Sequence, residues 1–559
     1  MKDTFFRSMT WLHTWAGLLV CWVLLLVFFA GTLSYFRHEI SLWSKPELQQ
    51  NAYQAYDQLD IEKTVHDGQI YLSQTAPNAQ RWLITLPTER KPYASYSWQD
   101  MPEKGQRRGK VTEHVLTRDG KLIHDIRESK GGDFFYRLHF DLYYISPLTA
   151  RYIVGFCTVF MLITLISGIV IHKRIFKDFF SFRPNKGARS WLDFHNLSSV
   201  MALPYHLMIT YTGLITLMFM YMPWAIQSQY QGDQRAFTQD INPMRQIVKP
   251  ANEAAPLFMA SSLLPQVIQH WQQQPLRQVV ISTPNDKNSE ISFYLNTGTK
   301  ITDETEQMVF SGVTGDLKRQ SSDSHSGAQA TYDTLMSLHT ARFSDWALRG
   351  LFFICGLLGC AMIATGTLMW ALKIRQKQQK SLAAGNKPSL GLRLVEGLNF
   401  STILGLPLAT IGFFYANRLL PTQLANRAEW EVNCFFIGLT LTAIIAIKWR
   451  ERAHWRAMLK IIASLYFALP IVSLLVSQSA RVSSWPSPQQ VFDIDLQHIN
   501  LLHVGNATIF GVNLMLVIFG GLFWVAAHKM RPAKMNKKAT VRAPKIPMRN
   551  HDATIQGGQ

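Results

Sequence analysis

The sequence predicts an all-α polytopic membrane bundle that carries α+β domains outside the membrane. Of its 559 residues, 48% are hydrophobic, and they form long runs rather than an amphipathic pattern. Eight runs can cross a hydrocarbon layer of about 30 Å, which takes about 20 helical residues. These runs cover approximately residues 11–36, 149–172, 196–222, 347–372, 398–416, 431–447, 457–477 and 504–528. We therefore expect about eight transmembrane helices.

The first run, within residues 1–36, resembles a secretory signal because Lys2 and Arg7 precede it. The stretch WAGLLVCWVLLLVFFAGTLSYF is, however, longer than a typical signal core of about 7–15 residues, and no A-x-A cleavage site follows it. We therefore expect it to be retained as transmembrane helix 1.

Basic residues near the helix ends predict the orientation. Most of the excess lies in HKRIFKDFFSFRPNKGARSW, KIRQKQQK, KWRERAHWRAMLK and HKMRPAKMNKKATVRAPK. Lys and Arg in short loops stay on the cytoplasmic side, and all four segments fall on one side of an eight-span topology. We expect both termini, the loop within 149–222, the linker 373–397 and the tail 529–559 to be cytoplasmic at a bacterial inner membrane. The net charge of +19 reflects this topology, so nucleic-acid binding is not expected.

Two long segments, residues 37–148 and 223–346, must then lie in the periplasm. RWLITLP and YASYSW in the first, and RQVVISTP and EISFYLN in the second, have the alternating β-branched pattern of strands. TRDGK and VTGDLK are typical of turns. Each segment is expected to form a separate α+β domain, and residues 398–528 to form a four-helix membrane extension.

The cysteines are expected to pack as small apolar residues rather than to form disulfides. All of them lie in predicted spans: Cys21, Cys157, Cys355, Cys360 and Cys434. No C-x-x-C-H motif is present, which excludes covalent attachment of a c-type haem.

An internal repeat organises the first 372 residues. Aligning His13 with His195 places Gly31 on Gly213, and aligning RLHFDLYY with SLHTARF places His139 on His339. LISGIVIHKR matches IATGTLMWALK in the same way. A helix–domain–helix unit therefore occurs twice, and its functional site is expected between the two halves.

Six histidines in or near these spans are candidate axial ligands of haem iron: His13, His139, His172, His195, His206 and His339. Histidine near hydrocarbon is costly and is a candidate functional residue. Two neutral imidazoles on different helices can hold a b-type haem in a bundle. The repeat predicts one inner and one outer pair. His172 and His206 lack a histidine counterpart, and which imidazoles pair stays open.

Each histidine also has a plainer interpretation. His13 and His172 could be interfacial residues in basic, aromatic belts, and His206 could hydrogen-bond between helices. His139 and His339 could lie on amphipathic interfacial helices. Three arginines at the outer ends are candidate partners for haem propionates or for a carboxylate-bearing substrate: Arg137, Arg151 and Arg342.

The motifs WLHTWAGL, RLHFDLYY, SGIVIHKRIFKDFFSFRP, WLDFHNLSSVMALPYHLMITYTGL and ATGTLMWALK resemble those of the PepSY-associated transmembrane helix proteins, often called iron-regulated membrane proteins. The resemblance covers residues 1 to about 375, and the last four spans are similar to the extension of longer members. It implies PepSY-like external domains, haem b and a reductase linked to ferric-siderophore uptake.

Missing motifs limit the mechanism. No G-x-G-x-x-G follows a predicted strand, and no cytoplasmic loop exceeds about 25 residues, so neither flavin nor NAD(P) is expected. Electrons would come from a separate cytoplasmic reductase or from membrane quinol. H-E-x-x-H, G-x-S-x-G and P-loop motifs are also absent.

We therefore expect a haem-b electron-transfer protein, with two bis-histidine haems, that reduces a ferric chelate on the periplasmic side. The resemblance implies a ferric siderophore as that chelate; the catalytic residues stay unassigned. The alternative is a non-enzymatic sensor or assembly factor that binds a periplasmic peptide or protein. A transporter is less consistent with the sequence, because the spans lack the Asp or Glu at mid-depth that coupling to ions or protons usually needs.

Overall fold

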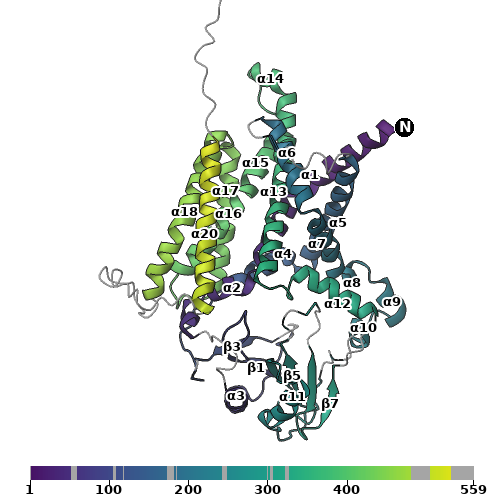
Figure 1. Ribbon diagram of the computed structural model, residues 1–559, viewed down its shortest axis with the longest axis vertical. Coiled ribbons are helices and arrows are strands. Elements are labelled where there is room, and N and C mark those ends of the chain that lie inside the picture. The colour runs from purple at the N-terminus through teal and green to yellow at the C-terminus, as the bar shows by residue number, and fades with distance from the viewer. Residues whose placement is uncertain are drawn as a thin grey trace, which may run out of the picture.

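The computed structural model is mostly helical, with one antiparallel sheet at one end of a helix bundle (Figure 1). We call the end that carries the sheet the sheet side and the opposite end the far side. The described residues are 2–51, 60–104, 109–117, 119–172, 182–183, 186–241, 244, 248–296, 298, 300–301, 306–321, 327–479 and 504–530. Residues 173–181 of the expected basic loop and the tail from residue 531 lie outside them.

Within this described part, seven helical stretches are long and apolar enough to cross a membrane, one fewer than expected. Three belong to the repeat: α1 (Lys2–Ser34), α5 (Pro147–Ile171) and α13 (Trp346–Lys377). The others form the extension: α15 (Leu390–Ile403) with α16 (Gly405–Leu419), α17 (Arg427–Lys448), α18 (Arg452–Ser479) and α20 (Val504–Lys529). All five cysteines lie in these helices and are free, as expected.

The span expected at residues 196–222 is divided. Helix α6 (Ala188–Met201) ends before Ala202, α7 (Leu203–Thr216) begins after this residue, and the short α8 (Met218–Tyr221) follows. Pro204 lacks the N–H that would continue α6, and its ring crowds the preceding turn. Helix α6 packs on α13, whereas α7 packs on α5 and on α12 (Gly327–Thr340).

The two halves of the repeat contain equivalent sets of helices. In the first half, α1 packs on α5 and on the short sheet-side helix α4 (Gly131–Asp141). In the second half, α6 and α7 take the place of α1, while α12 and α13 take the places of α4 and α5. The first half therefore supplies two membrane-capable helices, the second supplies one together with the divided pair α6 and α7, and each half adds a short histidine-bearing helix.

The two external segments form one continuous sheet rather than two separate domains. The first contributes β1 (Arg81–Thr85), β2 (Ser95–Gln99) and β3 (Val111–Val115). The second contributes β4 (Leu276–Ser282), β5 (Glu290–Leu295), β6 (Gln307–Ser311) and β7 (Leu317–Gln320). The order is β3-β2-β1-β4-β5-β6-β7, and β1 pairs antiparallel with β4.

The pairing of β1 with β4 corrects the expectation of two separate domains. Each small sheet alone would expose one of these strands as an edge, and their pairing provides hydrogen-bond partners for the backbone groups of both edges. The four runs expected to be strands are confirmed as β1, β2, β4 and β5. One face of the sheet is apolar, with Trp82, Ile84, Ile281 and Phe293 fully buried beside Leu72 of α3 (Ile61–Thr75).

Further short elements belong to the part of the chain that the structure describes. Near the sheet lie α2 (Arg37–Trp43), η1 (Pro46–Asn51), η3 (Ala260–Leu263) and α11 (Leu264–His270). Elsewhere lie α9 (Trp224–Tyr230), α10 (Gln234–Ile241) and α14 (Gln379–Ala383), the last at the far side (Figure 1).

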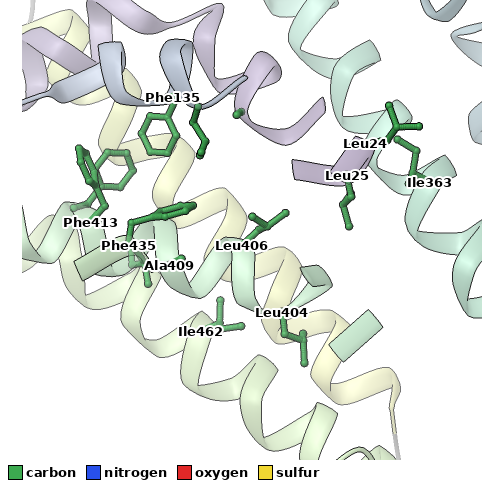
Figure 2. Packing of buried hydrophobic residues seen from close by; sticks show 14 of the residues in the cluster. Leu24, Leu25, Phe135, Ile363, Leu404, Leu406, Ala409, Phe413, Phe435 and Ile462 are labelled. Atoms are coloured by element: carbon green, nitrogen blue, oxygen red, sulfur yellow. The ribbon is translucent and has the colours of Figure 1, made fainter. Parts of the chain in front are cut away.

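The four-span extension packs beside the first half through aromatic side chains. Figure 2 shows Phe135 of α4 close to Phe413 and Phe435 of the extension. The ring centroid of Phe135 lies 5.4 Å from that of Phe413, and the neighbouring Phe134 stacks on Phe413 at 5.0 Å. No described residue of the extension lines the cavities of the candidate site described below.

A buried polar network also joins the extension to the first half. Arg427 donates to Glu431 (2.6 Å) and to the carbonyl of Glu128 (2.7 Å). Asn417 donates to Glu431 (2.7 Å), and Ser129 donates to its other carboxylate oxygen (2.8 Å). Arg427 and Glu431 are fully buried, so each charge depends on the other for compensation.

We expect Glu431→Ala to destabilise the protein by about 3–5 kcal/mol, because it leaves Arg427 buried without its counter-charge. Thermal unfolding in detergent measures this as a lower midpoint. The matched control is Glu253→Ala, which removes an exposed ion pair with Lys287 and should change stability by less than about 1 kcal/mol. Equal effects of the two changes would contradict a structural role for the network.

Candidate functional site

Four of the six candidate histidines form two facing pairs. His13 of α1 faces His195 of α6 on the far side, with ring centroids 6.5 Å apart. His139 of α4 faces His339 of α12 on the sheet side, at 6.0 Å. Each pair takes one ring from each half of the repeat, and the two pairs lie at two levels of the bundle.

Within its own half, each ring is held by a neighbouring helix. The Nδ1 of His13 lies 2.9 Å from the carbonyl oxygen of Thr164, and that of His139 lies 2.7 Å from the carbonyl oxygen of Val27. A carbonyl only accepts, so Nδ1 carries the hydrogen in both rings. The Nε2 atoms therefore keep the free lone pairs with which imidazole binds metals.

The rings of the second half are held in the same manner. His195 Nδ1 lies 2.9 Å from the carbonyl oxygen of Met362. His339 Nδ1 lies 3.0 Å from the hydroxyl of Thr212, which itself donates to the carbonyl of Met208 and so accepts from the ring. All four Nδ1 atoms are thus committed as donors.

A glycine lies beneath each ring. A Cβ atom added to any of these glycines would contact a histidine ring closely, at 2.7 Å for Gly31, 3.1 Å for Gly213, 3.2 Å for Gly168 and 3.4 Å for Gly366. The glycines belong to AG, TG, SG and TG dipeptides in the motifs that define the repeat. A small residue followed by glycine therefore recurs at all four positions, and this pattern in the sequence could have indicated where the histidine rings pack.

The far-side pair lines a cavity of about 380 Å³. Its walls are mostly apolar and include Gly17, Gly168 and Gly366, and Lys373 is its one charged side chain among the described lining residues apart from histidine. His172, the residue that follows α5, also lines this cavity but faces no second described histidine ring. Its place is therefore beside the His13–His195 pair, not in a pair of its own.

The sheet-side pair lines a second cavity of about 280 Å³. Both volumes are comparable with the roughly 300–1,000 Å³ of typical ligand sites. Arg37, Arg90 and Arg342 line the second cavity, and no described acidic side chain lines either one. The sheet-side cavity therefore suits a ligand with an apolar body and anionic groups.

Burial keeps the sheet-side imidazoles neutral. It lowers the pKa of His339 to about 3, to which the neighbouring His139 contributes, and it also lowers the pKa of His139. The neutral ring is the form that binds a metal.

His206 lines neither cavity. It is fully buried, and neither ring nitrogen makes a hydrogen bond, although the backbone of Ser199 and Cys355 lies nearby. Its ring centroid lies 6.4 Å from that of Phe28 and 5.8 Å from that of Tyr205. It stays apart from both pairs.

The candidate arginines also divide into those that line a cavity and those that do not. Arg342 lines the sheet-side cavity, whereas Arg137 and Arg151 pair with Asp141 at 3.6 and 2.8 Å and do not line it. Arg37 and Arg90 were missed. Arg90 comes from the loop between β1 and β2. No local sequence pattern indicates that this loop reaches the sheet-side cavity.

Two opposed imidazoles suit a planar metal macrocycle. A metal–imidazole bond is about 2.0–2.1 Å long, so two such bonds and the radii of both rings place the centroids roughly 6 Å apart. The observed 6.5 and 6.0 Å match this spacing. Among the described residues, no three His, Cys, Asp or Glu side chains gather to hold a bare ion.

Comparison with known proteins extends the resemblance seen in the motifs. Residues 10–373 match the family model described as the PepSY-associated TM region. The chain is also 24% identical over 332 residues to uncharacterized protein PA4219 of Pseudomonas aeruginosa, which covers 56% of this chain and 79% of that protein. The family match contains both histidine pairs and their four glycines, and it ends before the four-span extension.

We expect Gly31→Ala to destabilise the protein by about 1–3 kcal/mol, because its Cβ would force the His139 ring to move. Gly350→Ala in α13 is the matched control. Its Cβ meets no atom within 4 Å, so alanine should be neutral or stabilising by up to about 1 kcal/mol. Thermal unfolding of both variants tests the contact, and a neutral Gly31→Ala would contradict it.

Proposed function

This chain belongs to the family of the PepSY-associated TM region, and we propose that it is a haem-b protein that carries electrons across a bacterial inner membrane to reduce a ferric chelate. The observation that carries the proposal is the presence of two pairs of facing imidazole rings, one pair at each level of the bundle. In each ring Nδ1 makes a hydrogen bond, which leaves Nε2 available for iron. Haem, when bound, supplies an iron that accepts and releases one electron at a time.

The residues of each cavity have distinct roles in this proposal. His13 and His195 would hold one haem, and His139 and His339 the other. The glycines leave room for the four imidazole rings against the neighbouring helices. Carbonyl and hydroxyl acceptors fix the ring orientation, which strengthens imidazole as a ligand.

Basic side chains would receive the acidic groups of the macrocycle. Arg37, Arg90 and Arg342 stand around the sheet-side cavity, and Lys373 lines the far-side cavity. Their charges match propionate groups, and Arg37 and Arg90 also pair with Asp133 and Glu39, which do not line the cavity.

The direction of transfer follows from the distribution of basic residues. The short segments at the far-side helix ends, such as KIRQKQQK and KWRERAHWRAMLK, are dense in Lys and Arg, so we assign the far side to the cytoplasm, and the sheet would face the periplasm. Both termini would then be cytoplasmic. The electron donor would be a cytoplasmic reductase or membrane quinol acting at the far side, because the chain has no motif for NAD(P) or flavin.

The acceptor is proposed to be a ferric siderophore or a related ferric chelate at the sheet side. One electron converts its Fe(III) to Fe(II), and hard oxygen ligands hold Fe(II) less tightly, so iron is released. The siderophore identity rests on the family resemblance rather than on the chemistry of any one side chain.

Absorbance spectra of the purified, full-length protein, oxidised and then reduced with dithionite, test the proposal. We expect a low-spin b-type spectrum with two haems per chain. His13→Ala and His139→Ala should each lose one of the two, because each removes an axial ligand of a different site.

His66→Ala is the matched control, since His66 is exposed, pairs with its neighbour Asp67 and is not among the residues that line either cavity. It should keep both haems. A protein that stays colourless when expressed with added haem would refute the proposal and favour the non-enzymatic sensor. A full haem content in both alanine variants would refute the assigned ligands.

A further inference from the structure

A single layer of side chains separates the two cavities. Leu24 of α1 and Met161 of α5 line both of them, so each cavity begins where the other ends. In α7, Leu203 lines the far-side cavity and Thr210 lines the sheet-side cavity. His206 lies between them on the same helix face, about one turn from each.

The repeat assigns four positions to this layer. Each is seven residues before one of the glycines that carry the histidine rings, which is about two helical turns. They are Leu24 before Gly31, Met161 before Gly168, His206 before Gly213 and Gly359 before Gly366. The first half therefore supplies Leu and Met, and the second half supplies His and Gly.

The His and Gly of the second half fit each other. A Cβ added at Gly359 would lie 3.2 Å from His206 Nε2 and 2.7 Å from the ring of Phe28. The missing side chain at Gly359 thus makes room for two aromatic rings. Phe28 and His206 meet edge to face, and both are in the layer or next to it.

The imidazole is unfavourable for stability at this position. It is fully buried, and neither nitrogen has a hydrogen-bond partner. Burying a polar group without a partner costs free energy that leucine, its counterpart in the repeat, would not. A buried, unpaired histidine in a membrane bundle is a candidate functional residue.

His206 is poorly placed to be a third axial ligand. The other four rings already face one another in pairs, and no second described histidine ring contacts that of His206. Its nearest ring neighbours are Phe28 and Tyr205, which are not iron ligands in this arrangement.

We infer that His206, with Phe28, is the aromatic bridge through which electrons pass between the two haem levels. The inference rests on the proposed function. With both haems bound, one electron would leave Fe(II) at the far side, which would become Fe(III), and would reduce Fe(III) at the sheet side to Fe(II). No bond forms and no proton moves. Tunnelling slows steeply as the gap between conjugated systems widens, and an aromatic ring shortens that gap. His206 is thus a positioning residue for transfer.

The test uses full-length protein in liposomes, with the sheet side outward and both haems reduced. Ferricyanide, which cannot cross the membrane, is added outside. The sheet-side haem is oxidised first, and the far-side haem follows only through the layer, so the slow phase of the absorbance change reports transfer between them. His206→Leu, which places the counterpart residue of the repeat here, should slow this phase several-fold.

Three further measurements separate a bridge from a structural role. His206→Leu should keep both haems with an unchanged spectrum, and its unfolding temperature should not fall. His206→Phe should restore the rate because it restores the ring. Phe156→Leu, which removes an exposed aromatic ring from α5 that lines neither cavity, should leave the rate unchanged.

Each result decides between explanations. An unchanged slow phase in His206→Leu, with two haems bound, overturns the bridge and leaves the proposed function intact. Loss of one haem in His206→Leu overturns it in favour of axial ligation. Wild-type protein that binds no haem overturns both proposals together.

Discussion

The contact between an imidazole ring and a glycine on the neighbouring helix determines how the helices of the repeat approach one another. Any larger side chain at Gly31 or Gly213 would push away the helix that carries the ring. The division of α6 and α7 follows the same constraint. The break at Ala202 lies between His195, which packs on α13, and Gly213, which receives His339 from α12. Facing rings at two levels are the result.

Much of this architecture could be predicted because it depends on local pattern. Long apolar runs predict α1, α5 and α13, and alternation predicts β1 and β4. The pairing of β1 with β4 could not be predicted in this way, because it joins residues nearly two hundred positions apart and depends on both strands being left as edges. The division at Ala202 was missed because hydropathy continues across it, although Pro204 was a local warning.

The site shows the same limit at the level of single residues. Repeat alignment predicts that His13 and His195, and likewise His139 and His339, occupy equivalent places, and the fold brings these residues face to face. It does not distinguish Arg151, which lines neither cavity, from Arg90, which a loop of the sheet places at the sheet-side cavity. His206 lies in the same motif as His195, yet the packing around Gly359 separates it from both pairs.

The anchoring of the rings by main-chain oxygens affects how such a site is inherited. Thr164, Val27 and Met362 present a carbonyl to their histidines, and a carbonyl is supplied by every amino acid. The amino acid at the anchoring position can therefore change with little effect on the hydrogen bond, whereas the path of the helix backbone cannot. Relatives can therefore diverge widely in sequence and still orient the imidazoles alike. Such divergence has to preserve the backbone path of these helices and the few glycines that contact the rings.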